Sequence, residues 1–189
     1  EYTEKTPIDW PSVPNHLRAE EWIHAYCPFI SKLEIWHNDA VCAVDQLSSW
    51  RVISHRDLDP KNVLWQGLDP WLIDWEAAGY INPLQEMLET AFYWADDGKG
   101  GLDEEKFVTF IHAYEQHISL KEAPWQMIGS ACFLGMLEWL HYNVRRALGE
   151  EATGEQEMQL GKEQVVSTIQ ALYALEKKNK TVLGLINNR

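Results

Sequence analysis

A short island of strand-like sequence interrupts a chain whose other patterns are mostly helical. Runs of residues typical of strands occupy 51–55, 63–66 and 70–74, and the last two runs are separated by the turn-forming stretch from Gly67 to Pro70. The sequence therefore predicts an α+β fold that is mainly α, with one small β hairpin.

The flanking segments carry helix signals. Pro7, Pro11 and Pro14 predict an irregular lead-in over residues 1–14, and a capping residue at Asn15 opens the first helix. Apolar residues recur on one face of the last helix, as in other amphipathic helices. The predicted helices are 15–26, 31–46, 83–95, 103–117, 123–148 and 161–178.

Composition is that of a globular protein. The chain has 189 residues, of which 46% are hydrophobic and 24% charged. The longest apolar stretch, 128–140, is too short to span a bilayer and contains Glu138. The three cysteines are widely spaced, without a C-x-x-C pair, which favours a reducing compartment over a disulfide framework. We therefore expect a cytoplasmic protein without a secretory signal or a membrane partner.

The net charge of −13 restricts the class of partner. Nucleic-acid binding requires lysine and arginine facing phosphates, so an acidic chain argues against that function. An acidic surface favours a cationic ligand, although a merely solvated acidic surface explains the charge equally well.

The chemistry is concentrated in two neighbouring motifs. Residues 54–65 read SHRDLDPKNVLW, and residues 72–76 read LIDWE. Phosphoryl transfer requires a carboxylate that accepts the proton of the attacking hydroxyl, and oxygen ligands that hold Mg²⁺ against the nucleotide phosphates. Asp57 suits the first role, and Asn62 and Asp74 at adjacent strand ends suit the second. The alternative is that Asp57 and Asn62 only cap a turn.

The H-x-D-x-x-x-x-N motif followed by I-D-W-E resembles the signature of the aminoglycoside phosphotransferase and choline kinase family. The resemblance implies that Asp57 is the catalytic base, that Asn62 and Asp74 bind the metal, and that His55 braces the loop. It continues through residues 77–86, which are similar to the Gly-Asp-Pro segment of the family. Asn82 replaces the usual Asp there, and Glu86 stands where Asp is usual.

This resemblance implies a protein-kinase-like C-terminal lobe over residues 15–189. It also implies ATP and Mg²⁺ as cofactors and a small-molecule hydroxyl as phosphoryl acceptor. A protein kinase is the main rival, but Asp59 replaces its lysine, Asp74-Trp75-Glu76 replaces its Asp-Phe-Gly, and no activation segment follows.

Kinases hold the nucleotide phosphates with a glycine-rich loop and a Lys–Glu pair upstream of the catalytic loop. The sequence before His55 contains no glycine-rich hairpin, so we expect the N-terminal nucleotide lobe to be absent from this chain. We expect the chain alone to be inactive. A non-catalytic lobe that binds a ligand or a partner is the alternative function.

The acceptor is expected to be small and cationic, like an aminoglycoside, choline or thiamine. Ten tryptophans could supply rings for cation–π binding, although most such rings fill cores. Glu138, Trp139 and Tyr142 on the predicted helix 123–148 are the candidate substrate residues. The apolar run 132–140 predicts that Trp139 is in the core, whereas Glu138 and Tyr142, four apart, share an exposed face.

Overall fold

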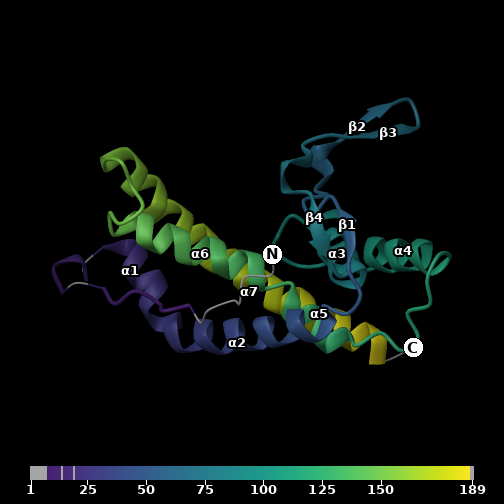
Figure 1. Ribbon diagram of the computed structural model, residues 1–189, viewed down its shortest axis with the longest axis horizontal. Coiled ribbons are helices and arrows are strands. Elements are labelled where there is room, and N and C mark those ends of the chain that lie inside the picture. The colour runs from purple at the N-terminus through teal and green to yellow at the C-terminus, as the bar shows by residue number, and fades with distance from the viewer. Residues whose placement is uncertain (1–7, 14, 19, 188–189) are drawn as a thin grey trace. The chain divides into compact units, whose positions relative to one another are not determined.

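The computed structural model describes residues 8–13, 15–18 and 20–187 (Figure 1). These residues form two compact units. Unit 1 comprises the described residues up to Cys42 together with Phe133–Ala174, and unit 2 comprises Ala43–Cys132 together with the described residues from Leu175 onward.

Unit 1 is built from helices. Its elements are α1 (Glu21–Tyr26), the larger part of α2 (Ile30–Leu47), α6 (Leu134–Ala147) and the first part of α7 (Glu155–Asn187), with 3₁₀ turns at Asn15–Leu17 and Cys27–Phe29. Aromatic side chains join these helices. The ring of Phe29 lies 4.8 Å from that of Tyr173, and the ring of Trp36 lies 5.0 Å from that of Phe133.

A glycine allows α6 and α7 to approach closely within unit 1. A Cβ atom on Gly161 would lie 2.7 Å from the backbone nitrogen of Ala147, which is closer than packed atoms tolerate. Val144 and Val165 beside this contact are fully buried. The two helices therefore pack backbone to backbone here.

Unit 2 contains all the strands that the structure describes. Its elements are β1 (Val52–Ser54), β2 (Val63–Gln66), β3 (Asp69–Leu72), β4 (Gly79–Ile81), α3 (Pro83–Trp94), α4 (Glu104–Glu115), α5 (Trp125–Ala131) and the end of α7. Two 3₁₀ turns, Pro60–Asn62 and Trp75–Ala77, precede β2 and follow β3.

The strands form two separate antiparallel pairs. β1 pairs with β4 in the register Val52↔Ile81, and β2 pairs with β3 in the register Val63↔Leu72. Figure 1 shows the β2–β3 hairpin extending away from α3 and from the β1–β4 pair. The structure is thus mainly helical with two small antiparallel strand pairs.

The end of α7 is fixed to unit 2 by polar contacts. Lys178 is 9% exposed, and its ammonium group donates to the carbonyl of Phe92 and to the carboxylate of Asp96. Asn179 donates to the carbonyl of Gly129 at 3.0 Å, and a Cβ atom on Gly129 would clash with this side chain. A buried lysine needs such partners to offset the loss of water.

Most predicted elements are confirmed, but several boundaries were wrong. The predicted helix 15–26 is a 3₁₀ turn followed by α1, and the last helix is longer than predicted. The predicted helix 123–148 is two helices, α5 and α6, and glycines flank the break at Gly129 and Gly135. Glycine weakens a helix relative to alanine, so Gly129 and Gly135, which lie within the two helices, favour an interruption between them.

Other outcomes concern single residues and short segments. Residues 8–13 of the predicted lead-in have no helix or strand, and its remaining residues lie outside the described part. β4 was not predicted, because it begins at Gly79 and is followed by Asn82 and Pro83, which are residues typical of turns. None of the helices described is both long and apolar enough to cross a bilayer. Cys27 and Cys42 are exposed, Cys132 is buried, and none of the three forms a disulfide.

Asn82 joins the segment before β1 to the start of α3. Its side-chain oxygen accepts hydrogen bonds from the backbone of Leu84 and Gln85, and its amide donates to the carbonyls of Leu47 and Trp50. The side chain is only 5% exposed, so water cannot replace these partners. This network explains how Asn can occupy the position at which the family that the sequence resembles usually has Asp.

We predict that Asn82→Ala destabilises the chain by about 3 kcal/mol, because it removes a helix cap and the amide group that donates to the carbonyls of Leu47 and Trp50. Chemical denaturation measures the effect. Asp103→Ala is the matched control, because Asp103 caps the exposed start of α4 through a single backbone contact, and we expect a loss of about 1 kcal/mol. Equal losses in the two variants would contradict the buried network.

Candidate functional site

The motif loop, residues 55–62, runs from the end of β1 to the start of β2. Within it, the amide nitrogen of Asn62 donates to the backbone oxygen of Asp57 at 2.8 Å and to its carboxylate oxygen Oδ2 at 2.9 Å. Asn62 is 3% exposed, whereas the side chain of Asp57 is 35% exposed. The contact fixes the carboxylate of Asp57. It leaves the side-chain oxygen of Asn62, Oδ1, as the atom of this residue that could bind a cation.

The hairpin end brings Asp74 next to this loop. The β2–β3 ladder continues through a hydrogen bond from the backbone nitrogen of Ile73 to the backbone oxygen of Asn62, at 3.0 Å. Asn62 and Asp74 therefore lie at the adjoining open ends of the hairpin. His55 Nε2 donates to the oxygen of Ile73 at 2.8 Å, since a carbonyl can only accept, and its ring packs 4.7 Å from that of Trp75.

Backbone strain is concentrated at this site. Among the residues that the structure describes, the only non-glycine residues with positive φ are Arg56, at 65°, and Asp74, at 64°. Such conformations cost on the order of 1–3 kcal/mol each and persist only where surrounding contacts hold them, often at functional sites. The guanidinium of Arg56 packs against Gly79, where a Cβ atom would lie 2.9 Å from Nη1.

Helix α3 holds the motif loop at two points. Its Glu86 accepts a hydrogen bond from the backbone nitrogen of Arg56 at 2.7 Å, and its Trp94 donates the indole N–H to the oxygen of Leu58 at 2.9 Å. These contacts flank Asp57 on either side along the chain. The position of the Asp57 carboxylate is thus set by α3 as well as by Asn62.

Charged groups surround Asp57. The ammonium group of Lys61 lies 3.9 Å from the carboxylate oxygens of both Asp57 and Asp59. Burial raises the pKa of Glu89 on α3 to about 7, and the hydrogen bond from Gln85 opposes that shift.

The phenol of Tyr93 on α3 lies in the same negatively charged surroundings as Glu89. Its pKa is raised to about 12, mainly by burial and then by the negative charges of Asp57, Glu89 and Asp59. Both Glu89 and Tyr93 therefore belong to the electrostatic surroundings of the motif loop.

The donor set restricts which metal could bind. The described residues contain no cluster of three or more His, Cys, Asp or Glu side chains suited to a metal. Mg²⁺ is usually held by one or two protein carboxylates together with substrate phosphates and water. An Asn oxygen and an Asp carboxylate at adjoining strand ends fit that pattern, with Asn62 already oriented by Asp57.

A surface pocket of about 510 Å³ lies elsewhere in unit 2, beside Leu47, Trp50, Asn82 and Lys121. No residue of the motif loop lines this pocket, and neither does Asp74. The pocket is therefore not part of the candidate site.

The structure brings together four of the predicted site residues. His55, Asp57, Asn62 and Asp74 all lie in unit 2, linked through the contacts at the hairpin end. The sequence offered no reason to single out Lys61, Glu89 and Tyr93, and it presented Trp94 only as one of several rings that could bind a cation. A usable signal for the last three was their helical spacing from Glu86, at three, seven and eight residues.

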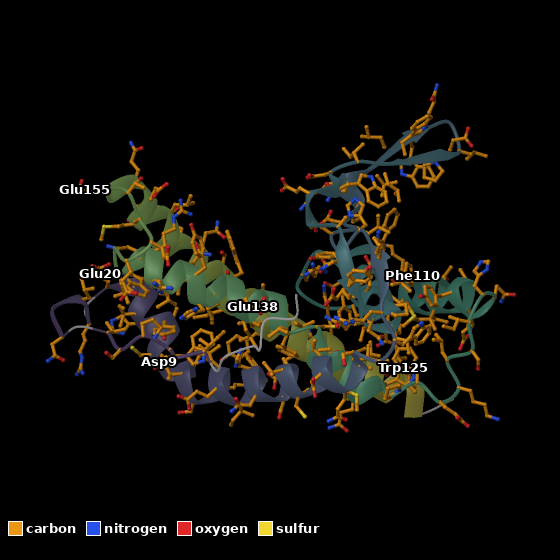
Figure 2. All side chains as sticks on the ribbon, viewed as in Figure 1. Asp9, Glu20, Phe110, Trp125, Glu138 and Glu155 are labelled. Carbon is orange, nitrogen blue, oxygen red and sulfur yellow. The ribbon has the colours of Figure 1, made fainter. Side chains whose placement is uncertain are left out.

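The three predicted substrate residues lie in unit 1, on α6. Glu138, labelled in Figure 2, is exposed, and Tyr142 is 39% exposed, so these two share an exposed face as predicted. The prediction that Trp139 is in the core was wrong: it is 46% exposed and its ring stacks on that of Tyr142 at 5.6 Å. The stacking partner lies one helical turn away, so Trp139 is covered locally. Their binding role stays a prediction.

The comparisons with known proteins agree with the geometry. A sequence model of the phosphotransferase enzyme family (APH) matches residues 6–119, which is more than half of the chain. This chain belongs to that phosphotransferase family. The match includes the motif loop, the hairpin and α3, and it confirms the resemblance to aminoglycoside phosphotransferases and choline kinases. Searches of curated proteins and of solved structures gave no match.

Titration of Glu89 in this phosphotransferase should make stability depend on pH. Its folded-state pKa, about 7, exceeds the ordinary value of 4.5, so the folded chain retains the proton to higher pH than the unfolded chain does. The free energy of unfolding should therefore fall as pH rises from about 4.5 to about 7.

We predict that Glu89→Gln, which keeps the shape without the charge, is more stable than the parent by about 2 kcal/mol at pH 8 and equal to it at pH 4. Denaturant titrations across this range measure the difference. Glu105→Gln at the exposed start of α4 is the control and should show no such trend. A pH-independent difference for Glu89→Gln would refute the assignment.

Proposed function

We propose that this chain is the catalytic lobe of a small-molecule kinase that transfers the γ-phosphoryl group of ATP to an alcohol. The observation that carries the proposal is the hydrogen bond from Asn62 to Asp57 Oδ2 at 2.9 Å. It orients a partly exposed carboxylate, and it uses the amide nitrogen of Asn62, so that the side-chain oxygen of Asn62 could bind a cation together with Asp74. Family membership supports phosphotransferase chemistry in general.

In the proposed reaction Asp57 acts as the catalytic base. Its free carboxylate oxygen accepts the proton of the acceptor hydroxyl, while the hydroxyl oxygen forms a bond to the γ-phosphorus. The bond between that phosphorus and the β–γ bridging oxygen breaks, so ADP leaves with the electron pair. The products are ADP, the phosphate ester and the proton held by Asp57.

Asn62 and Asp74 would hold Mg²⁺, which neutralises the charge of the phosphates when it is bound. His55 would keep the two ligands together, because its ring ties the motif loop to Ile73 beside Asp74. The strained conformation of Asp74 would be maintained by the hairpin pairing behind it. Lys61, beside Asp57, would add positive charge near the transferred group.

The chain is proposed to be a protein-kinase-like C-terminal lobe whose phosphate clamp lies outside residues 1–189. Large apolar side chains of the hairpin next to Asp74 support this proposal. They are exposed, and exposed apolar patches are typical of surfaces that bind another protein surface. The exposed fractions of these side chains are 54% for Leu64, 57% for Trp65, 92% for Leu68 and 60% for Trp71.

The acceptor is proposed to be a small cation like an aminoglycoside, choline or thiamine, in keeping with the net charge of −13. Glu138, Trp139 and Tyr142 remain candidate contacts for it. The scattered cysteines, none of which forms a disulfide, support a cytoplasmic location. The second candidate function, a lobe that binds without turnover, is favoured by the helical structure of the described residues before β1, which include no glycine-rich hairpin.

We predict that Asp57→Asn, in a protein that includes the clamp, lowers kcat by a factor on the order of 10³ while KM changes little, because only proton transfer is lost. Asp74→Ala should instead abolish Mg²⁺-dependent nucleotide binding, measured by calorimetry. Asp69→Asn at the hairpin turn, remote from the ligand ends, is the control. Turnover near that of the parent in Asp57→Asn would remove Asp57 from the base role.

A further prediction concerns the chain alone. Purified residues 1–189 should hydrolyse or transfer no measurable ATP γ-phosphate, since phosphoryl transfer depends on gripping and aligning the phosphates. A radiolabelled-ATP assay with mixed amino alcohols measures this. Turnover that disappears in Asp57→Asn would contradict the proposed external clamp and show that the lobe is self-sufficient.

A further inference from the structure

The last turn of α3 makes two contacts, one with the motif loop and one with α7. Trp94, the final residue of α3, donates its indole N–H to the backbone oxygen of Leu58 at 2.9 Å, directly after Asp57. Two residues earlier, the backbone oxygen of Phe92 accepts a hydrogen bond from the ammonium group of Lys178 at 3.0 Å. The turn that holds the motif loop is therefore itself held by α7.

The oxygen of Phe92 is one of those that the end of a helix leaves without an intrahelical donor. The backbone nitrogen of Asp96, four residues further on, bonds to the oxygen of Tyr93 instead, at 3.4 Å. A cation at this position also interacts favourably with the negative end of the helix dipole. Lys178 thus completes the end of α3.

Lys178 has a second partner just beyond α3. Its ammonium group donates to the carboxylate of Asp96, whose other oxygen accepts a hydrogen bond from the backbone nitrogen of Gly98 at 2.7 Å. Asp96 also forms a β-bridge with Leu102. The lysine is buried, whereas the side chain of Asp96 is 40% exposed. Lys178 therefore ties the segment that follows α3 as well as its last turn.

The neighbours of Lys178 on the same face of α7 are apolar. Leu175, three residues before it, and Val182, four residues after it, are both buried. Burying a lysine between them costs free energy, and apolar residues in place of a buried ion pair are often neutral or stabilising. Stability alone therefore does not account for the lysine, which indicates that its hydrogen-bond donor is needed at this position.

We infer that Lys178 is a positioning residue for the motif loop. It fixes the last turn of α3, and through the indole of Trp94 it fixes the backbone next to the Asp57 carboxylate. The inference rests on the proposed function for the role of Asp57 as base. It does not involve Glu86, which holds the loop from the first turn of α3.

Lys178→Met tests the contact directly, because methionine occupies a similar volume without the ammonium group. Exchange of the Trp94 indole proton with water is measured by NMR on the whole 189-residue chain. We expect this exchange to be about tenfold faster than in the parent, because the hydrogen bond to Leu58 opens more often. The midpoint of urea unfolding should change little. Lys180→Met, at an exposed position of α7, is the matched control and should leave both measurements unchanged.

Kinetics separate positioning from stability. In a protein that includes the clamp, Lys178→Met should lower kcat about tenfold with little change in KM, because a displaced base is poorly aligned with the bound acceptor. Trp94→Phe, which removes the indole N–H, should lower kcat similarly. The double variant should be no slower than either single variant, because both changes act through one contact. Lys178→Arg keeps a donor and should retain more activity than Lys178→Met.

Two results would overturn the inference. One is Trp94 indole exchange in Lys178→Met that equals that of the parent. The other is a fall in kcat for the double variant that equals the product of the two single falls, since independent actions multiply. If Lys178→Met does not fold, Asp96→Ala takes its place, because that side chain is partly exposed, and unchanged indole exchange there contradicts the inference equally.

Failure of the proposed kinase chemistry looks different. In that case Asp57→Asn would leave turnover unaffected, while exchange of the Trp94 indole proton in the whole chain still responded to Lys178→Met.

Discussion

The hydrogen bond from the backbone nitrogen of Arg56 to the Glu86 carboxylate fixes the start of the motif loop, on which the position of Asp57 depends. It anchors Arg56, the residue directly before the proposed base, in a conformation with positive φ. Residues other than glycine rarely adopt that conformation. The loop can hold that strain because the indole of Trp94 secures Leu58 on the other side of Asp57. A charge-assisted bond of this kind is stronger than a neutral one, so it suits the task.

The other end of the loop depends on the hairpin. Asn62 bonds to Asp57 within the loop and shares the ladder with Ile73, so one residue couples the proposed base to the strand that delivers Asp74. The hairpin itself has two strands and an exposed apolar surface, and such isolated pairs are marginally stable in water. We therefore propose that another protein surface covers the hairpin and helps to keep the proposed metal ligands, Asn62 and Asp74, in place.

The sequence was sufficient for the motif because its residues are close along the chain. His55, Asp57 and Asn62 belong to one loop, and a short hairpin carries the chain to Asp74, so spacing alone indicated their proximity. The break between α5 and α6 was missed because an apolar run continues across it, and the exposure of Trp139 was missed for the same reason. Apolar character indicates a preference for burial, but whether a partner covers the ring depends on packing.

By itself the sequence determined the family motif, the mainly helical composition of the fold, and the hairpin that separates Asn62 from Asp74. Only the tertiary structure decided which helix lies against the motif loop, and hence that Glu86 and Trp94 hold the residues on either side of Asp57. Contacts such as that from Arg56 to Glu86 join residues thirty positions apart. Their formation depends on how β1, β4 and α3 pack together, a property that no local sequence period encodes.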